Sequence, residues 1–258
     1  MSDTGDFGEV SGFALEARYL PGKPDLPVLV LLHEGLGCVS LWRDFPDQLQ
    51  AATQCPVLVY SRPGYGRSDA RPLPWPLTYM HDEASTVLPG VLEQLGEREF
   101  ILVGHSDGAS IAILYAGNKP ADGLKGLVLM APHVFVEDIS IEGIRAARDA
   151  WQTTDLRERL KKHHGENVDC AFYGWNDSWL HPDFKNWDIT SSLPHISVPT
   201  IAIQGVDDDY GTLAQLDTIA GMSGGAVSTL VLEQCGHSPQ KDQTATVLGA
   251  ISTFITEL

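Results

Sequence analysis

The sequence contains little cysteine, and what it has is scattered. Cys38, Cys55, Cys170 and Cys235 lie far apart in a chain of 258 residues. They show no paired spacing, so we expect reduced thiols in a cytoplasmic protein and no metal site. The opening MSDTGDFGEV has neither a positive region nor an apolar stretch, which argues against a secretory leader.

Basic residues are also scarce: 17 Lys and Arg stand against 34 Asp and Glu, a formal charge of -17. Such a surface repels nucleic-acid phosphates and anionic lipids, and it weakly favours neutral or cationic small-molecule substrates. No apolar run is long enough to span a bilayer. With 43% hydrophobic residues, the chain should form a soluble domain with a sizeable core, or two small domains.

Six short apolar runs alternate with segments of helical pattern. Runs that are apolar on both faces are typical of strands buried between two helix layers, so a mostly parallel sheet flanked by helices is predicted. The expected strands are 28–32, 57–60, 100–103, 127–130, 200–203 and 229–232. The expected helices are 78–95, 107–116, 212–220 and 243–258.

Residues 132–194 interrupt this alternation. They hold four of the six tryptophans, and their apolar residues follow roughly helical spacing. We predict a helical cap here, inserted into a core made of residues 1–131 and 195–258. A pair of longer crossover helices is the alternative. The cap aromatics Trp151, Trp175 and Trp179 are predicted to roof a small pocket, although packing within the cap must account for most aromatics there.

Ser106 is the candidate nucleophile. It lies in Gly104-His-Ser-Asp-Gly108, between a predicted buried strand and a predicted helix. In this context G-x-S-x-G forms a sharp, strained turn that exposes the serine hydroxyl. A serine between glycines in an ordinary turn is the alternative.

A serine hydroxyl needs a base, and His237 is the candidate because it follows the last predicted strand in the loop CGHSP. His105 adjoins the serine, but its side chain should point away. His163 and His164 end a predicted cap helix, where interaction with the helix dipole is a sufficient explanation.

The candidate acid lies in IQGVDDDYGT, after the preceding strand. Three adjacent carboxylates cannot all reach one imidazole. We predict Asp208, with Asp207 as the rival and Asp209 near the start of the next helix. A buried carboxylate at this position would fix the imidazole tautomer.

The order Ser106, Asp208, His237 resembles that of the α/β-hydrolase superfamily. Two further motifs, HEGLG at 33–37 and SRPGYGRS at 61–68, extend the resemblance over nearly the whole chain. It implies an α/β-hydrolase fold and an oxyanion hole formed by N–H groups of Gly35 or Leu36 and of Asp107. Glu34 interrupts the usual His-Gly pair, and Ser61 replaces the usual aspartate.

Asp107 beside the nucleophile has two interpretations: it binds a cationic substrate group, or it caps the following helix. The reaction expected is ester hydrolysis through an acyl-enzyme, with no cofactor. Alternatives are C–C bond hydrolysis or lyase chemistry on the same triad, an amino-acid-ester hydrolase or aminopeptidase, and a slow-turnover ligand receptor. The physiological substrate and the oligomeric state are not predicted.

Overall fold

The computed structural model describes residues 5–118, 120 and 122–258. Residues 1–4, 119 and 121, all within the predicted core 1–131, lie outside the described residues. The first four of them also belong to the segment MSDTGDFGEV, from which we argued against a secretory leader.

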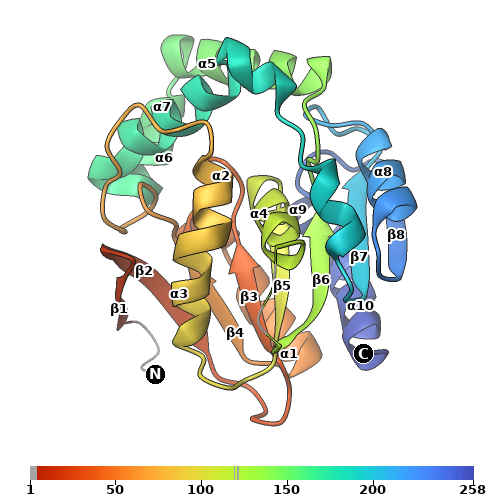
Figure 1. Cartoon of the computed structure of the whole chain (residues 1–258). Coiled ribbons are helices and arrows are strands. Elements are labelled where there is room, and N and C mark those ends of the chain that lie inside the picture. Colours follow the sequence, from red (N-terminus) through yellow and green to blue (C-terminus); the bar gives the residue numbers. More distant parts are fainter. Residues whose placement is uncertain (1–4, 119, 121) are drawn as a thin grey trace.

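A single eight-stranded sheet organises the chain (Figure 1). Its spatial order is β1-β2-β4-β3-β5-β6-β7-β8. The strands are β1 Gly5–Val10, β2 Phe13–Leu20, β3 Val28–Leu32, β4 Val57–Tyr60, β5 Phe100–His105, β6 Leu124–Met130, β7 Thr200–Gly205 and β8 Val227–Leu232. β3 to β8 run parallel, and β2 joins β4 in antiparallel fashion. The predicted mostly parallel sheet flanked by helices is therefore confirmed.

The sheet departs from the sequence prediction at both edges. The antiparallel pair β1 and β2 was not predicted, because β2 is mostly half-buried and lacks a continuous apolar run. β8 was predicted to be buried on both faces, and this is wrong. It is an edge strand, and its Val231 side chain is 43% exposed.

Helices cover both faces of the sheet. One face packs against α2 Tyr79–Asp82, α3 Leu88–Glu93, α4 Asp107–Ala116 and α8 Ala214–Met222. The other packs against α1 Phe45–Thr53 and α10 Thr244–Thr256, with the short α9 Pro239–Asp242 leading into α10. The predicted helix 78–95 forms as α2 and α3 joined by a π-helical turn, Glu83–Val87.

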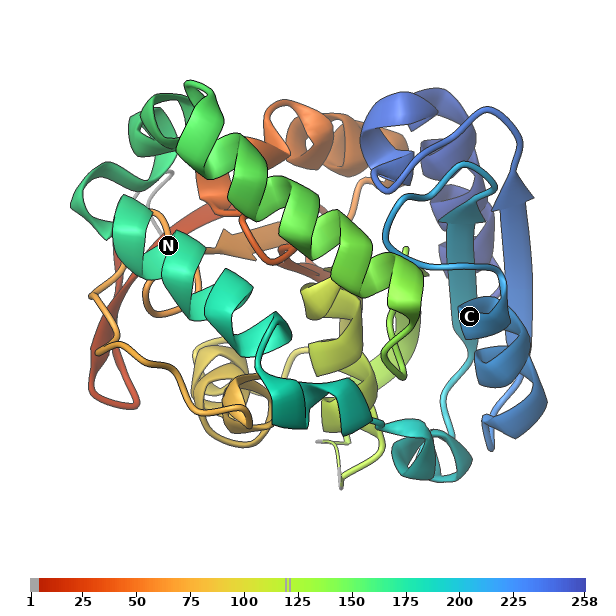
Figure 2. The ribbon, with the colours of Figure 1, turned by 90° about the horizontal axis from the view of Figure 1, so that it is seen from above.

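The chain between β6 and β7, which we call the cap segment (residues 132–194), lies over the carboxyl ends of the strands (Figures 1 and 2). Its α-helices are α5 Asp138–Thr153, α6 Leu156–His164 and α7 Val168–Trp179. Short 3-10 turns follow at Gly165–Asn167, Pro182–Asn186 and Thr190–His195. No helix in the described part of the chain is both long enough and apolar enough to cross a membrane.

Candidate active site

Ser106 sits at the turn between β5 and α4. Its backbone adopts φ 53° and ψ -119°, a conformation that is costly for any residue except glycine. The flanking glycines make this turn possible: a Cβ on Gly108 would lie 2.0 Å from the carbonyl oxygen of Leu32, and one on Gly104 would lie 2.5 Å from that of Gly108. Close packing of strand, helix and turn thus requires glycine at both positions.

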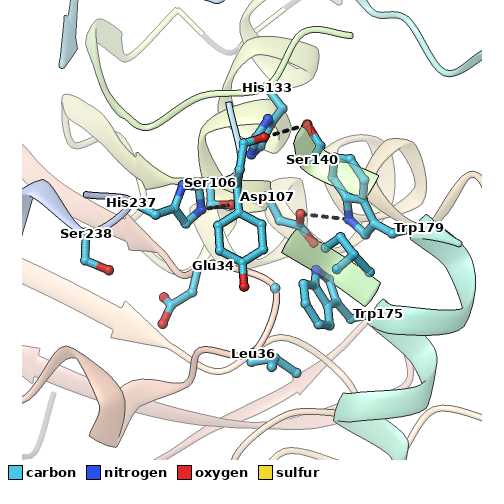
Figure 3. A pocket seen from close by; sticks show the side chains of 13 residues that line it. Glu34, Leu36, Ser106, Asp107, His133, Ser140, Trp175, Trp179, His237 and Ser238 are labelled. Atoms are coloured by element: carbon cyan, nitrogen blue, oxygen red, sulfur yellow. Dashed lines mark hydrogen bonds between the residues drawn. The ribbon is translucent and has the colours of Figure 1, made fainter. Parts of the chain in front are cut away.

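Ser106, His237 and Asp208 form a continuous hydrogen-bonded array. His237 Nε2 lies 2.9 Å from Ser106 Oγ (Figure 3), and His237 Nδ1 lies 2.8 Å from Asp208 Oδ1. Since an ionised carboxylate can only accept, Nδ1 carries the proton and Nε2 accepts from the serine hydroxyl. This is the arrangement that a base needs before it removes the proton of a serine.

Asp208 is the member of the acidic run that the fold buries. Its carboxylate accepts from the backbone N–H of Tyr210 and from Gln204, whereas Asp207 and Asp209 are exposed. Burial alone would raise the pKa of Asp208, but the hydrogen bond and charge of His237 outweigh it and hold the pKa below its ordinary value. The carboxylate therefore stays ionised at neutral pH.

The HEGLG loop (33–37) is held by three buried side chains. His33 Nδ1 donates to the carbonyl of Glu34, and Arg62 Nη2 donates to the same carbonyl at 2.9 Å. His164 Nδ1 accepts from the N–H of Gly66, and its Nε2 donates to the carbonyl of Leu36 at 3.0 Å. His164 was assigned only to the helix dipole, but the structure places it between two loops of the site. Nothing in its sequence context pointed there.

Glu34 connects this loop to the nucleophile turn. Its carboxylate lies 3.4 Å from His105 Nδ1, and His105 Nε2 donates to the backbone carbonyl of His237 at 2.6 Å. Burial lowers the pKa of His105, but the hydrogen bond and charge of Glu34 outweigh this and raise it overall. The same pairing lowers the pKa of Glu34 to about 2 against the opposing effect of burial. The residue that interrupts the usual His-Gly pair thus links three loops of the site.

Glu34→Gln should remove this ion pair while keeping the size of the side chain. The pair stabilises the fold above the ordinary pKa of Glu34, and its contribution is lost as pH rises through the raised pKa of His105. We therefore expect Glu34→Gln to cost on the order of 1 kcal/mol of unfolding free energy at pH 6, and less at pH 9. Urea unfolding at both pH values checks this, with exposed Glu142→Gln on α5 as the matched charge control. An equal loss at the two pH values would contradict it.

Asp107 is buried, and it makes two hydrogen bonds that neither of its predicted interpretations included. Its carboxylate accepts from the Trp179 indole N–H at 3.3 Å (Figure 3), and it also accepts from the Tyr79 hydroxyl at 2.6 Å. Asp107 is also the acidic residue in the first turn of α4, where a negative charge suits the helix dipole, so the helix-capping interpretation stays a prediction. Burial raises its pKa. Through these bonds Asp107 joins α2, the nucleophile turn and the cap segment, and it lines the cavity beside Ser106.

Asp107→Ala should destabilise the protein strongly, because it removes the acceptor of the buried Tyr79 hydroxyl and one of the two acceptors of the Trp179 indole N–H, the other being the Tyr79 oxygen at 3.0 Å. We expect a loss of about 3 kcal/mol in unfolding free energy, and about 1 kcal/mol for Asp107→Asn, whose amide oxygen can still accept from Tyr79. Urea denaturation of both variants measures the difference. Equal stabilities for the alanine and asparagine variants would show that these hydrogen bonds contribute little.

A cavity of about 230 Å³ opens onto Ser106. Its lining, shown in Figure 3, combines the HEGLG loop, the nucleophile turn, the cap segment and the His237 loop: Glu34, Gly35, Leu36, Ser106, Asp107, His133, Ser140, Ile144, Trp175, Trp179, Tyr210, His237 and Ser238. All three residues predicted for the oxyanion hole are among them.

Of the three predicted pocket tryptophans, two line this cavity and one does not. Trp175 packs so closely on Gly35 that a Cβ there would lie 2.0 Å from the indole nitrogen. Trp179 reaches Asp107 from the cap segment. Trp151 stands apart from the lining, stacked on Phe172 with 3.9 Å between ring centroids. It packs within the cap segment because α5 turns that face toward α7.

His133 lines the cavity and was not predicted. It is buried, and this burial is the main cause that lowers its pKa to about 3, so the ring is neutral. Its Nδ1 has no hydrogen-bond partner among the described residues. No sequence pattern pointed to it, since it follows β6 at a proline, outside any motif. The described residues contain no cluster of three or more His, Cys, Asp or Glu placed to hold a metal ion.

The model of a family described as "Alpha/beta hydrolase family" matches residues 29–250. Two curated relatives are similar over different extents. A 2-succinyl-6-hydroxy-2,4-cyclohexadiene-1-carboxylate synthase from Enterobacter sp. (strain 638) is 34% identical over 160 residues, which is 62% of this chain and 57% of that protein. A proline iminopeptidase from Lactobacillus helveticus (strain DPC 4571) is 23% identical over 90% of this chain and 91% of its own length. The chain thus spans little more than half of the first relative and nearly all of the second.

Among solved structures, an esterase from Exiguobacterium antarcticum superimposes with a TM-score of 0.71 at 18% identity. The alignment covers 99% of this chain and 100% of the esterase. At this level of identity the likeness shows the fold alone.

Proposed function

The chain belongs to the alpha/beta hydrolase family, and from that premise we propose that it is a serine hydrolase that cleaves a small ester through an acyl-enzyme. One observation carries the proposal: the array Ser106–His237–Asp208, with distances of 2.9 and 2.8 Å, opens onto a cavity of about 230 Å³. A strained serine beside an oriented imidazole has no structural purpose that we can identify in the fold.

In the proposed reaction, the Ser106 hydroxyl attacks the ester carbonyl as His237 Nε2 takes its proton. The resulting imidazolium is stabilised by the buried carboxylate of Asp208. His237 then returns the proton to the departing alcohol, which leaves the acyl group on Ser106 Oγ. Water, activated by the same imidazole, hydrolyses the acyl-enzyme and restores the serine.

The negative oxygen that develops in each tetrahedral intermediate needs fixed donors. We assign this role to the backbone N–H groups of Gly35 or Leu36 and of Asp107, since all three residues line the cavity with Ser106. The hydrogen bonds of Arg62 and His164 to the carbonyls of this loop support the assignment, because they fix the direction of its peptide groups.

The size of the cavity favours short acyl groups. Ligand pockets for larger molecules typically enclose about 300 Å³ or more, and Leu36, Ile144 and Trp175 provide apolar walls here. We expect kcat/KM for p-nitrophenyl esters to be highest between acetate and butyrate and to fall at least about tenfold by octanoate. A steady-state panel from acetate to octanoate measures this, and a maximum at octanoate would contradict it.

The remaining interpretations are outcomes of the same panel. Labelling of Ser106 by a fluorophosphonate without ester turnover would favour C–C cleavage or lyase chemistry. The carboxylate of Asp107 in the cavity raises the amino-acid-ester alternative, so the panel includes glycine p-nitrophenyl ester and its N-acetyl form. A clear preference for the free amine would support that alternative. Tight ligand binding without labelling or turnover would favour a receptor.

A further inference from the structure

A second cavity, of about 330 Å³, adjoins the one that opens onto Ser106. The two share Glu34 and Ser238, and both residues lie at the His237 side of the first cavity in Figure 3. The second cavity lies between the turn that leads into α1 and the α9–α10 region. In Figure 2, α1 stands next to the α9–α10 region. A substrate seated at Ser106 could therefore extend past this boundary.

Two cationic residues line this second cavity. Arg43 and Lys241 line it, and neither forms an ion pair with an acidic group of the described residues. The start of α1, a nine-residue helix, also borders it and adds the positive end of a helix dipole. Arg43 is held at φ 54°, a backbone conformation that costs energy in a residue with a side chain.

The two carboxylates in the lining already have partners. Glu34 lies against His105 at 3.4 Å, and Asp44 accepts from the amide of Gln48 at 2.6 Å. Asp44 keeps its negative charge in this bond, but neither carboxylate forms an ion pair with Arg43 or Lys241 among the described residues. In a chain with a formal charge of -17, two cations without an ion-pair partner in the cavity that adjoins the Ser106 cavity are a local exception to the general acidity.

Two buried polar atoms in the same lining also lack partners. The indole Nε1 of Trp42, a residue only 5% exposed, and the side-chain oxygen of Gln240 have none among the described residues. Only the Trp42 N–H is a donor, and the Gln240 oxygen offers nothing to an anion because it can only accept. A buried donor without an acceptor is costly to the fold. An oxygen-rich ligand in this cavity would give the Trp42 N–H its missing acceptor.

We propose that the second cavity binds a carboxylate carried by the substrate. The natural ester would then reach from Ser106 past Glu34 and Ser238, and the end of it that lies in the second cavity would be anionic. The proposal rests on the proposed serine-hydrolase function, because it assumes that the scissile ester bond of the substrate lies at Ser106. Arg43 and Lys241 supply the charge, and Trp42 supplies a neutral donor. The overall acidity of the chain would slow the approach of such a substrate, but short-range contacts decide its binding once it is seated.

Binding can be tested without turnover. Calorimetry on Ser106→Ala protein would compare 4-acetoxybenzoate with its neutral amide, 4-acetoxybenzamide. We expect the carboxylate to bind at least about tenfold more tightly, and the Arg43→Gln/Lys241→Gln pair of substitutions to remove that preference. Lys23→Gln, an exposed site at the opposite end of the strands, is the matched charge control and should retain it. Equal affinities for the two ligands before substitution, or a preference that survives both substitutions, would overturn the proposal.

Steady-state kinetics on the wild-type serine then separates the two proposals. Paired esters place the carboxylate either on the leaving group, as in 4-acetoxybenzoate, or on the acyl group, as in p-nitrophenyl hemiglutarate. A charge preference in either arm supports the anion site and shows which half of the substrate occupies it. Ser106-dependent turnover with no preference in either arm overturns the anion site and leaves the hydrolase function standing. Charge-selective binding without any turnover rejects the hydrolase function alone.

Discussion

Ser106→Ala is expected to lower kcat/KM for p-nitrophenyl acetate by roughly 10⁴- to 10⁶-fold. The substitution removes the oxygen that His237 Nε2 contacts at 2.9 Å, so no acyl-enzyme can form. The remaining rate would come from the oxyanion donors and from substrate binding, which act without the serine. Initial rates at several substrate concentrations, with the spontaneous hydrolysis subtracted, provide the measurement.

The array should also behave as one unit. His237→Ala is expected to cost about as much as Ser106→Ala, and the double variant should be no slower than the slower single variant, because either change alone abolishes nucleophilic attack. Circular dichroism and urea unfolding of each variant control for loss of fold. If the Ser106→Ala protein kept a tenth of its activity, another nucleophile would have to be sought.

Asp208→Asn is expected to reduce kcat by roughly 10²- to 10⁴-fold, with a much smaller change in KM. An asparagine in this position can turn its amide N–H toward His237 Nδ1, which then must give up its proton. The proton would move to Nε2, the atom that has to accept from Ser106. Removing one charge would thus disable the base without displacing it.

The neighbouring Asp207 offers a matched control for this prediction. Asp207→Asn makes the same chemical change one residue away, on an exposed side chain, and should alter kcat by less than about twofold. Both variants would be assayed at the same pH and ester concentration. A large loss for Asp207→Asn together with little loss for Asp208→Asn would refute the assignment of the acid.

The sheet and the three-residue array could be predicted because local patterns report them. The central strands are apolar on both faces, and each of Ser106, Asp208 and His237 follows a strand, where parallel sheets bring loops together. β2 was missed because half-exposed strands lack that signal. Glu34 pairing with His105, and His164 bridging two loops, depend on contacts across 71 and 128 residues of chain, respectively. No local pattern encodes such distances.

Which side chains line the pocket could not be predicted from the sequence either, because that too depends on contacts between distant parts of the chain. The cluster of tryptophans in 132–194 indicated an aromatic roof, but which indole reaches the cavity depends on how α5 and α7 pack together. Trp151 is turned toward Phe172, whereas Trp175 and Trp179 lie one helical turn apart on the same side of α7. His133 had no motif at all and is identified only by its position beside His237.

The hydrogen bond between Trp179 and Asp107 also limits which cap segments from other hydrolases could replace residues 132–194 of this chain. A chimaera that received residues 132–194 from another hydrolase would lose the indole donor unless the donor protein supplied a tryptophan at the matching place. Asp107 would then stay buried with Tyr79 as its remaining neutral partner, directly beside the nucleophile. Successful exchange of the segment should therefore require a matching substitution at position 107. In natural homologues, substitutions at positions 107 and 179 should likewise occur together.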